Sequence, residues 1–290
     1  ENASKNVQRA RELGTTTREL CAANSAAYER LLPALDISTD RFVRTSSEEH
    51  HRSATRFWNA CRPEDIVMRN YEGLYCTGCE DFYPEKDLTH GTCPIHGTEP
   101  QPVSERNYFF RLSAYQDRLE SLIATNEIRV RPASRKNEVL AFIRSGLRDF
   151  SISRDAQRTG GWGVPVPGDP SQILYVWFDA LINYLTGLGY GDSDAHLETF
   201  WLGNNRKLHV LGKDVAKFHA VYWPAMLLSA GLPVPDEILV HGFLTVEGRK
   251  IGKSLGNAVD PFPLLEEFGV DAVRYYLLRG VPASEEDRKS

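Results

Sequence analysis

Four potential metal ligands stand in two short pairs, and their spacing constrains the local fold more than any other feature of the chain. Two residues separate Cys76 from Cys79 and Cys93 from His96, and thirteen residues join the pairs. Two-residue spacers let each pair bind one ion, and the connecting loop can close a tetrahedron around it. The pattern predicts a zinc knuckle within residues 71–98. Because four protein ligands leave no open coordination position, this zinc should stabilise the fold rather than activate water.

The remaining cysteines agree with a metal site. The chain has five cysteines, an odd number, and three of them crowd into 76–93, which suits a metal better than a disulfide framework. Cys21 and Cys61 are interpreted as ordinary thiols. His90 is an alternative to His96 as the fourth ligand, and the site is structural in either case.

Composition narrows the class of protein. Of 290 residues, 41% are hydrophobic and 25% charged, enough for one large or two ordinary domains. The apolar runs fall far short of the roughly 20 residues that cross a bilayer, and the amino end shows no signal-peptide pattern, so we expect a cytoplasmic protein with no membrane partner. A net charge of −5 gives no broad basic surface, so local patches would hold any nucleic acid.

The apolar pattern predicts helices first and a strand–helix alternation later. Helical spacing, with capping residues at 15–17 and 46–47, predicts helices at 5–35 (broken at Gly14), 46–58, 112–124 and 137–147. Residues 68–98 are rich in aromatic residues, glycine and cysteine, with short strands at 73–75 and 82–83. Later strands are predicted at 173–176, 207–211 and 238–240, alternating with helices at 180–187 and 215–228. This alternation predicts an α/β fold with a parallel, doubly wound sheet.

Lys250 and Lys253 lie three residues apart in a loop that contains small residues. Such a loop suits closure on phosphate groups, although solvated lysines without a function are the alternative. The pattern argues against a P-loop, because Gly248 stands one residue too close to the Gly-Lys-Ser at 252–254 and prolines soon follow.

Polar and aromatic residues follow the predicted strands. Gly212 and Asp214 end the strand at 207–211 and enter a helix, where doubly wound sheets bind ligands. Asp214 could accept hydrogen bonds from ribose hydroxyls or cap the helix. Two helical faces either pack in the core or enclose a small apolar side chain. One face has Val215, His219 and Trp223 with Phe218 and Tyr222 beside them, and the other has Trp177, Ala180, Leu181 and Tyr184.

Taken in order, five motifs resemble the methionyl-tRNA synthetases. They are the Cys/His knuckle, GWGVPVPGDP at 161–170, YVWFDA at 175–180, GKD at 212–214 and KIGKS at 250–254. The likeness covers essentially the whole chain. The family is a class I aminoacyl-tRNA synthetase, so the resemblance implies a Rossmann-type catalytic domain split by a zinc-bearing connective insertion. The implied boundaries are 1–67 for the helical part of the first half, 68–150 for the insertion, 151–257 for the second half and 258–290 for the start of the stem-contact region.

The same resemblance implies an activity and a set of site residues. Methionine and ATP, the latter with Mg²⁺, would give methionyl-adenylate and pyrophosphate, and the methionyl group would pass to tRNA(Met). Trp177, Ala180, Tyr184, Val215, His219 and Trp223 would line the methionine pocket, with rings against the thioether. ATP would be bound by Gly212, Asp214, His241, Gly242, Leu244, Lys253 and Ser254. Lys250 and Lys253 would be catalytic, through the charge that grows on the phosphates, with the larger effect at Lys253.

The chain also departs from the family pattern. Ile251 and Gly252 stand where the family usually has methionine and serine, and residues 1–3 stand where many relatives have Glu-His-Gly. The histidine-rich first signature would lie before Glu1, and the anticodon-binding domain is missing, so we expect a fragment that does not aminoacylate alone. The alternatives are a paralogue that uses aminoacyl-adenylates outside translation, a synthetase for another apolar amino acid, and an incomplete relative that binds tRNA or protein.

Overall fold

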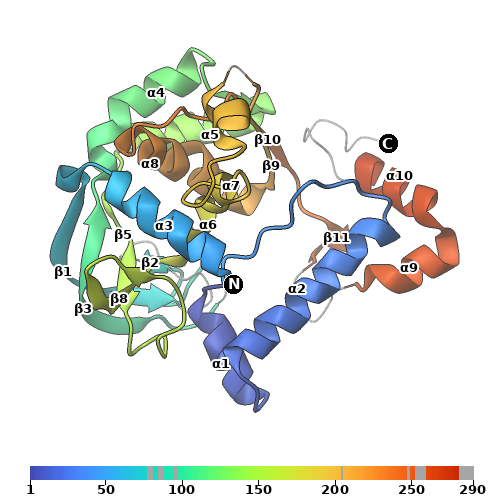
Figure 1. Ribbon diagram of the computed structural model, residues 1–290, viewed down its shortest axis with the longest axis horizontal. Coiled ribbons are helices and arrows are strands. Elements are labelled where there is room, and N and C mark those ends of the chain that lie inside the picture. The colour runs from blue at the N-terminus through green and yellow to red at the C-terminus, as the bar shows by residue number, and fades with distance from the viewer. Residues whose placement is uncertain are drawn as a thin grey trace.

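The computed structural model describes residues 1–76, 81–83, 88–94, 97–203, 205–246, 249–251 and 259–280. Figure 1 shows a main body that contains the larger sheets, with α3 (Glu48–Ala60) lying across it, and an arm in which α2 (Thr17–Ala34) extends towards α9 (Pro261–Phe268) and α10 (Val270–Gly280). Arg274 of α10 donates a hydrogen bond to the main-chain oxygen of Leu35, 2.6 Å away. Because Leu35 caps the carboxyl end of α2, this bond connects α10 to α2. Within the described ranges, no helix is long and apolar enough to span a membrane.

The amino-terminal helices begin where the sequence predicts. α1 (Ser4–Glu12) and α2 are separated at Gly14, which has a φ of +66°. Thr16 and Glu19 form a reciprocal capping box at the start of α2, and the side chain of Ser47 accepts from a main-chain N–H at the start of α3. Each cap satisfies donors that the first helical turn leaves without a partner.

A long antiparallel ribbon follows α3. β1 (Ile66–Cys76) pairs with β3 (Gln101–Phe110) over its length, from Ile66 opposite Phe110 to Tyr75 opposite Gln101. β2 (Asp81–Tyr83) and β5 (Phe150–Ser151) complete the strand order β2-β1-β3-β5. The strands predicted at 73–75 and 82–83 are confirmed, but the first is the end of a much longer strand. Next come a 3₁₀ turn (Leu112–Tyr115), α4 (Gln116–Ala124) and α5 (Ala133–Arg144), close to the predicted helices.

The predicted parallel sheet is confirmed. β10 (Glu237–His241) lies between β4 (Arg129–Arg131) and β9 (Leu208–Gly212) and runs parallel to both. Its pairing with β9 aligns the carboxyl ends of both strands, with His241 opposite Gly212. The edge strand β4 comes from within residues 68–150, so that segment contributes directly to this sheet.

One predicted member of the parallel sheet is wrong. The strand predicted at 173–176 is β8 (Asp169–Leu174), which pairs antiparallel with β6 (Ser153–Asp155) and β7 (Pro165–Val166) in a separate sheet. Gly168, with a φ of +80°, makes the tight turn that folds β7 back onto β8. β8 is thus paired locally on both sides, and Val176 already starts α6 (Val176–Leu181), which α7 (Asn183–Thr186) follows.

The predicted helix at 215–228 exists but is irregular. It starts as a 3₁₀ turn (Lys213–Val215), continues through a π-helical segment (Phe218–Tyr222) and ends as α8 (Trp223–Ser229). Pro224 has no N–H for the usual bond to the residue four positions earlier, and the wider π turn precedes it. A second π segment spans Glu198–Leu202, and β11 (Thr245–Val246) and β12 (Arg249–Lys250) form a small hairpin after β10.

One hydrophobic core joins the sheets and the helices of the main body. At its centre the Phe57 ring of α3 lies 6.0 Å from Phe178 of α6 and 5.6 Å from Trp223 of α8, and all three side chains are fully buried. Aromatic pairs at such distances add to the stabilisation from burial. The core therefore fixes α3, α6 and α8 against one another.

Candidate active site

Three of the residues predicted to bind ATP meet at the carboxyl ends of β9 and β10. A Cβ atom added to Gly212 would lie 3.2 Å from Asp214 Oδ1, a tight contact, and 3.6 Å from His241 Cε1, an ordinary one, so Gly212 lies directly beside both side chains. His241 Nδ1 lies 2.8 Å from its acceptor, the oxygen of Gly242, so in neutral His241 Nε2 is left as an acceptor. Asp214 is exposed inside the 3₁₀ turn, whose N-cap is Gly212, so it does not cap that turn. This strand edge can receive a polar ligand.

The predicted phosphate loop begins at the β11–β12 hairpin. Lys250 lies in β12, where its main chain pairs opposite Thr245. Lys250 is therefore part of a strand and not of the predicted loop. Leu244, 40% exposed, accepts a hydrogen bond from Ile251 N at 3.0 Å and closes the base of the hairpin. Lys253 and Ser254 lie outside the described residues, so their predicted roles stay predictions.

The two predicted aromatic faces lie against each other. Tyr184 Oη is 2.8 Å from His219 Nε2, and His219 Nδ1 is 3.0 Å from the main-chain oxygen of Val215. Burial lowers the pKa of His219, and the hydrogen bond to Val215 opposes this in part. In the neutral imidazole Nδ1–H donates to Val215, so Nε2 accepts from Tyr184. The chain of bonds fixes the phenol direction and leaves the Tyr184 oxygen as an acceptor for a ligand.

The other predicted methionine-pocket residues include Trp223 of α8 and Trp177 and Ala180 of α6. Trp223, fully buried, has its ring 6.2 Å from that of Tyr184. Trp177 stacks on Phe218, next to His219, at 4.0 Å with an 8° angle between the planes. Ala180 is half-buried one turn after Trp177 on α6. We predicted that these two faces lie at the ends of neighbouring strands of the parallel sheet. Because β8 is not in that sheet, the faces are brought together by helix packing instead.

His209 of β9 belongs to the same cluster and was missed in the sequence. Its ring lies 4.1 Å from that of Tyr184 and 6.0 Å from that of His219, and the side chain is buried. Burial, and then the nearby His219, lower the pKa of His209 to about 3. Side chains alternate between the two faces of a strand, so His209 points to the same side of β9 as Leu211, into the core. This alternation could have identified His209 from the sequence.

We expect acid sensitivity from His209. Its pKa is about 3 in the folded chain, against an ordinary value of 6.5, so the unfolded chain binds this proton more readily. Stability is therefore fully present above pH 6.5 and falls as the pH drops towards 3, by up to about 1.4 kcal/mol per pH unit for one such histidine. Urea unfolding at pH 7 and pH 5 should show a smaller loss for His209→Gln than for the wild type. An equal loss in both proteins would contradict this assignment.

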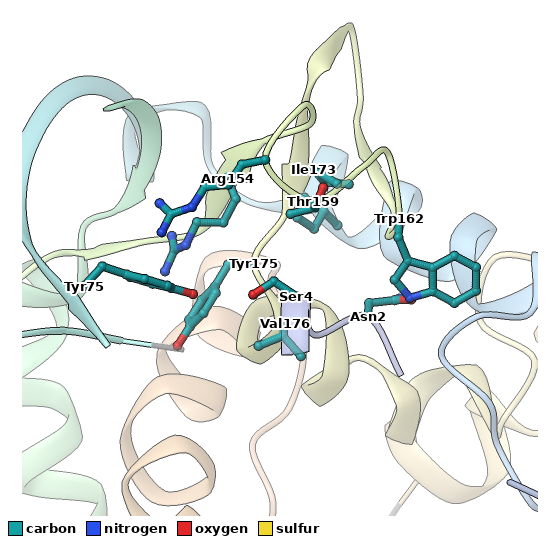
Figure 2. A pocket seen from close by; sticks show the side chains of 11 residues that line it. Asn2, Ser4, Tyr75, Arg154, Thr159, Trp162, Ile173, Tyr175 and Val176 are labelled. Atoms are coloured by element: carbon teal, nitrogen blue, oxygen red, sulfur yellow. The ribbon is translucent and has the colours of Figure 1, made fainter. Parts of the chain in front are cut away.

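A small pocket is lined by two arginines, Arg154 and Arg158, that were also missed in the sequence (Figure 2). The guanidinium carbon of buried Arg154 lies 4.2 Å from the centre of the Tyr175 ring, and that of Arg158 lies 4.4 Å from the Tyr75 ring. Arg154 also donates to Ser151 Oγ at 2.8 Å, so its position is fixed. Arg154 lies in β6 and Arg158 follows it, but the tyrosines beside them come from distant parts of the chain, so the sequence held no local signal for this pocket. Arg158 is also paired with Glu105 Oε1, 2.5 Å away, so its charge is already compensated within the structure.

Half of the predicted zinc knuckle lies within the described residues. Cys76, at the end of β1, and Cys93 are each 1% exposed. Thr98 contacts both: its Oγ1 is 3.9 Å from Cys76 Sγ, and its main-chain oxygen accepts from Cys93 N at 2.8 Å. Cys79 and His96 lie outside the described residues, and the described ones alone contain no group of three potential ligands. Two buried cysteines that both contact Thr98 fit one half of a Cys₃His donor set.

Comparison with known proteins decides the family. The family model described as tRNA synthetases class I (M) matches residues 2–102 and 86–289. The chain belongs to the class I tRNA synthetases (M). The methionine–tRNA ligase of Brucella suis is 43% identical over 99% of the chain, and that of Thermosynechococcus vestitus is 46% identical over 97%. The chain spans 55% and 53% of the lengths of these curated relatives.

A solved class I tRNA synthetase has the same fold. The structure of Mycobacterium tuberculosis methionyl-tRNA synthetase bound by methionyl-adenylate matches with a TM-score of 0.88 and 44% identity. The match covers 97% of this chain and 55% of that one. The Rossmann-like α/β architecture of the class I synthetases is therefore present in this chain.

Proposed function

We propose that this chain is the methionine- and ATP-binding part of a methionyl-tRNA synthetase. The observation that carries the proposal is the aromatic cluster of Tyr184, His219 and Trp223, which packs against His209 of β9. A flexible, polarisable thioether packs well against such rings. The solved relative that holds methionyl-adenylate supports the same substrate here.

In the proposed reaction the methionine carboxylate attacks the α-phosphorus of ATP, and pyrophosphate leaves. The acceptor oxygen of Tyr184 would orient the amino acid, with Val215, Trp177 and Ala180 around its side chain. Asp214 would accept from ribose hydroxyls, with Gly212 allowing close approach, and His241, Gly242 and Leu244 would lie beside the adenine. Lys250, Lys253 and Ser254 would stabilise the charge that grows on the leaving phosphates, and Mg²⁺ would supply further neutralisation.

In the second step a tRNA(Met) 3′-terminal hydroxyl would attack the adenylate carbonyl and release AMP. The proposed division is 1–67 for the helical part of the first half, 68–150 for the connective insertion, 151–257 for the second half and 258–290 for the stem-contact region.

The proposed zinc knuckle carries a separate prediction. We expect about one zinc ion per chain, held by Cys76, Cys79, Cys93 and His96, because this donor set closes a tetrahedron. Cys93→Ala should lose the zinc and melt at a lower temperature, while Cys21→Ala should keep it, since Cys21 lies on α2. The measurements are elemental analysis of the purified protein and thermal unfolding. Full zinc content in Cys93→Ala would contradict the ligand assignment.

The proposed function is tested by charging. A full-length synthetase that contains residues 1–290 should attach methionine to tRNA(Met) in the presence of ATP. Charging that is absent with methionine, while the purified protein still binds tRNA, would favour a binding module and overturn the proposal.

A further inference from the structure

A buried hydrogen-bond network lies behind α6, the helix that carries Trp177 and Ala180. Asp179 of α6 and His50 of α3 are both fully buried. His50 Nε2 lies 2.5 Å from Asp179 Oδ1, and His50 Nδ1 lies 2.9 Å from the hydroxyl of buried Thr186. Asn2 Nδ2 donates to Asp179 Oδ2 at 2.7 Å. One carboxylate thus ties α6 to two segments that are more than 100 residues away in the sequence.

The donor and acceptor roles make the network directional. A carboxylate oxygen accepts hydrogen bonds. His50 Nε2–H is therefore the donor in the hydrogen bond to Asp179 Oδ1. Asn2 is held in turn, because its amide also donates to the main-chain oxygen of Thr45 at 2.9 Å. A buried carboxylate that loses a donor is strongly destabilised, and α6 therefore has one preferred orientation about its axis.

The network and the proposed methionine site are on different faces of the same short helix. Phe178 packs against Phe57 and Trp58 of α3, with ring centres at 6.0 and 5.6 Å, on the side of Asp179. Trp177 instead stacks on Phe218. A rotation of α6 that broke the Asp179 contacts would move Trp177 off this stack.

We propose that Asp179 is a positioning residue for the amino acid. Through His50 and Asn2 it fixes the rotation of α6, so that Trp177 and Ala180 face the methionine side chain. The proposal rests on the proposed function, because it assigns Asp179 a part in forming that site.

The first test separates methionine binding from ATP binding. Asp179→Asn keeps the size of the side chain but turns an amide N–H towards one of two donors, so one hydrogen bond is lost. In pyrophosphate exchange by the full-length synthetase, we expect the KM for methionine to rise about tenfold and the KM for ATP to stay within about twofold. His50→Gln keeps an N–H donor for Asp179 and should stay within about threefold of the wild type. The half-buried neighbour His51, changed to Gln, is the matched control and should leave both constants unchanged.

An unchanged methionine KM in Asp179→Asn, or equal rises in both constants, would overturn the positioning role. If Asp179→Asn does not fold, Asn2→Ala carries the test. It removes only the second donor and should raise the methionine KM about threefold; no rise would overturn the role.

A second readout does not depend on activity. The 290-residue chain labelled with 5-fluorotryptophan should show a shifted Trp177 fluorine signal in Asp179→Asn and an unchanged signal for Trp201, which lies outside α6. An inactive wild type would defeat the proposed function alone. An unshifted Trp177 signal would defeat the positioning role alone.

Discussion

Replacing Lys253 by alanine in a full-length synthetase should lower kcat for methionine-dependent pyrophosphate exchange by about 10²–10³-fold. The leaving pyrophosphate gains negative charge in the transition state, and a lysine that meets it there lowers the barrier without strengthening methionine binding. The KM for methionine should therefore stay within about twofold. Steady-state kinetics at saturating ATP would measure both constants.

Two further lysine variants complete this experiment. Lys250→Ala should have a smaller effect, because its main chain is fixed in the β11–β12 hairpin, three residues before Lys253. Lys136→Ala, on α5 and bonded to Asn126 at 2.8 Å, is the control and should keep full activity. A Lys253→Ala enzyme with unchanged kcat would remove the catalytic role from this loop.

Replacing Trp223 by alanine should destabilise the chain by about 3–5 kcal/mol. This side chain is fully buried and packs against Phe57, Tyr184 and Trp201, so its removal leaves a cavity between α3 and α8. Urea unfolding followed by circular dichroism would measure the change. Tyr276→Ala, 61% exposed on α10, should change stability by less than about 0.5 kcal/mol. A loss below about 1 kcal/mol for Trp223→Ala would contradict its place in the core.

Local signals predicted much of the fold. The caps at Thr16 and Ser47 and the apolar period located the first helices, because these features act within one helical turn. The strands β9 and β10 were predicted because short apolar runs alternate with helices there. β3 was not predicted, because only its last residues are buried and its outer half is polar.

Features that depend on contacts between residues far apart in the sequence could not be predicted from the sequence. β8 has its own apolar run, and nothing in that run shows that β6 and β7 occupy its edges. β4 is only three residues long and is held as a strand by β10. The contact of His50 with Asp179 joins residues 129 positions apart, and the tyrosines around Arg154 come from separate strands and turns. The motif residues at the ends of β9 and β10 were found, since their position after a strand is a local feature.

The most direct test of the account is ATP–pyrophosphate exchange by the full-length synthetase with methionine, leucine, isoleucine and valine. The account predicts exchange with methionine, at a kcat/KM at least about 100-fold above that for each other amino acid, because the aromatic site favours an unbranched thioether. An equal or higher kcat/KM with leucine or isoleucine, or no exchange with methionine, would contradict it.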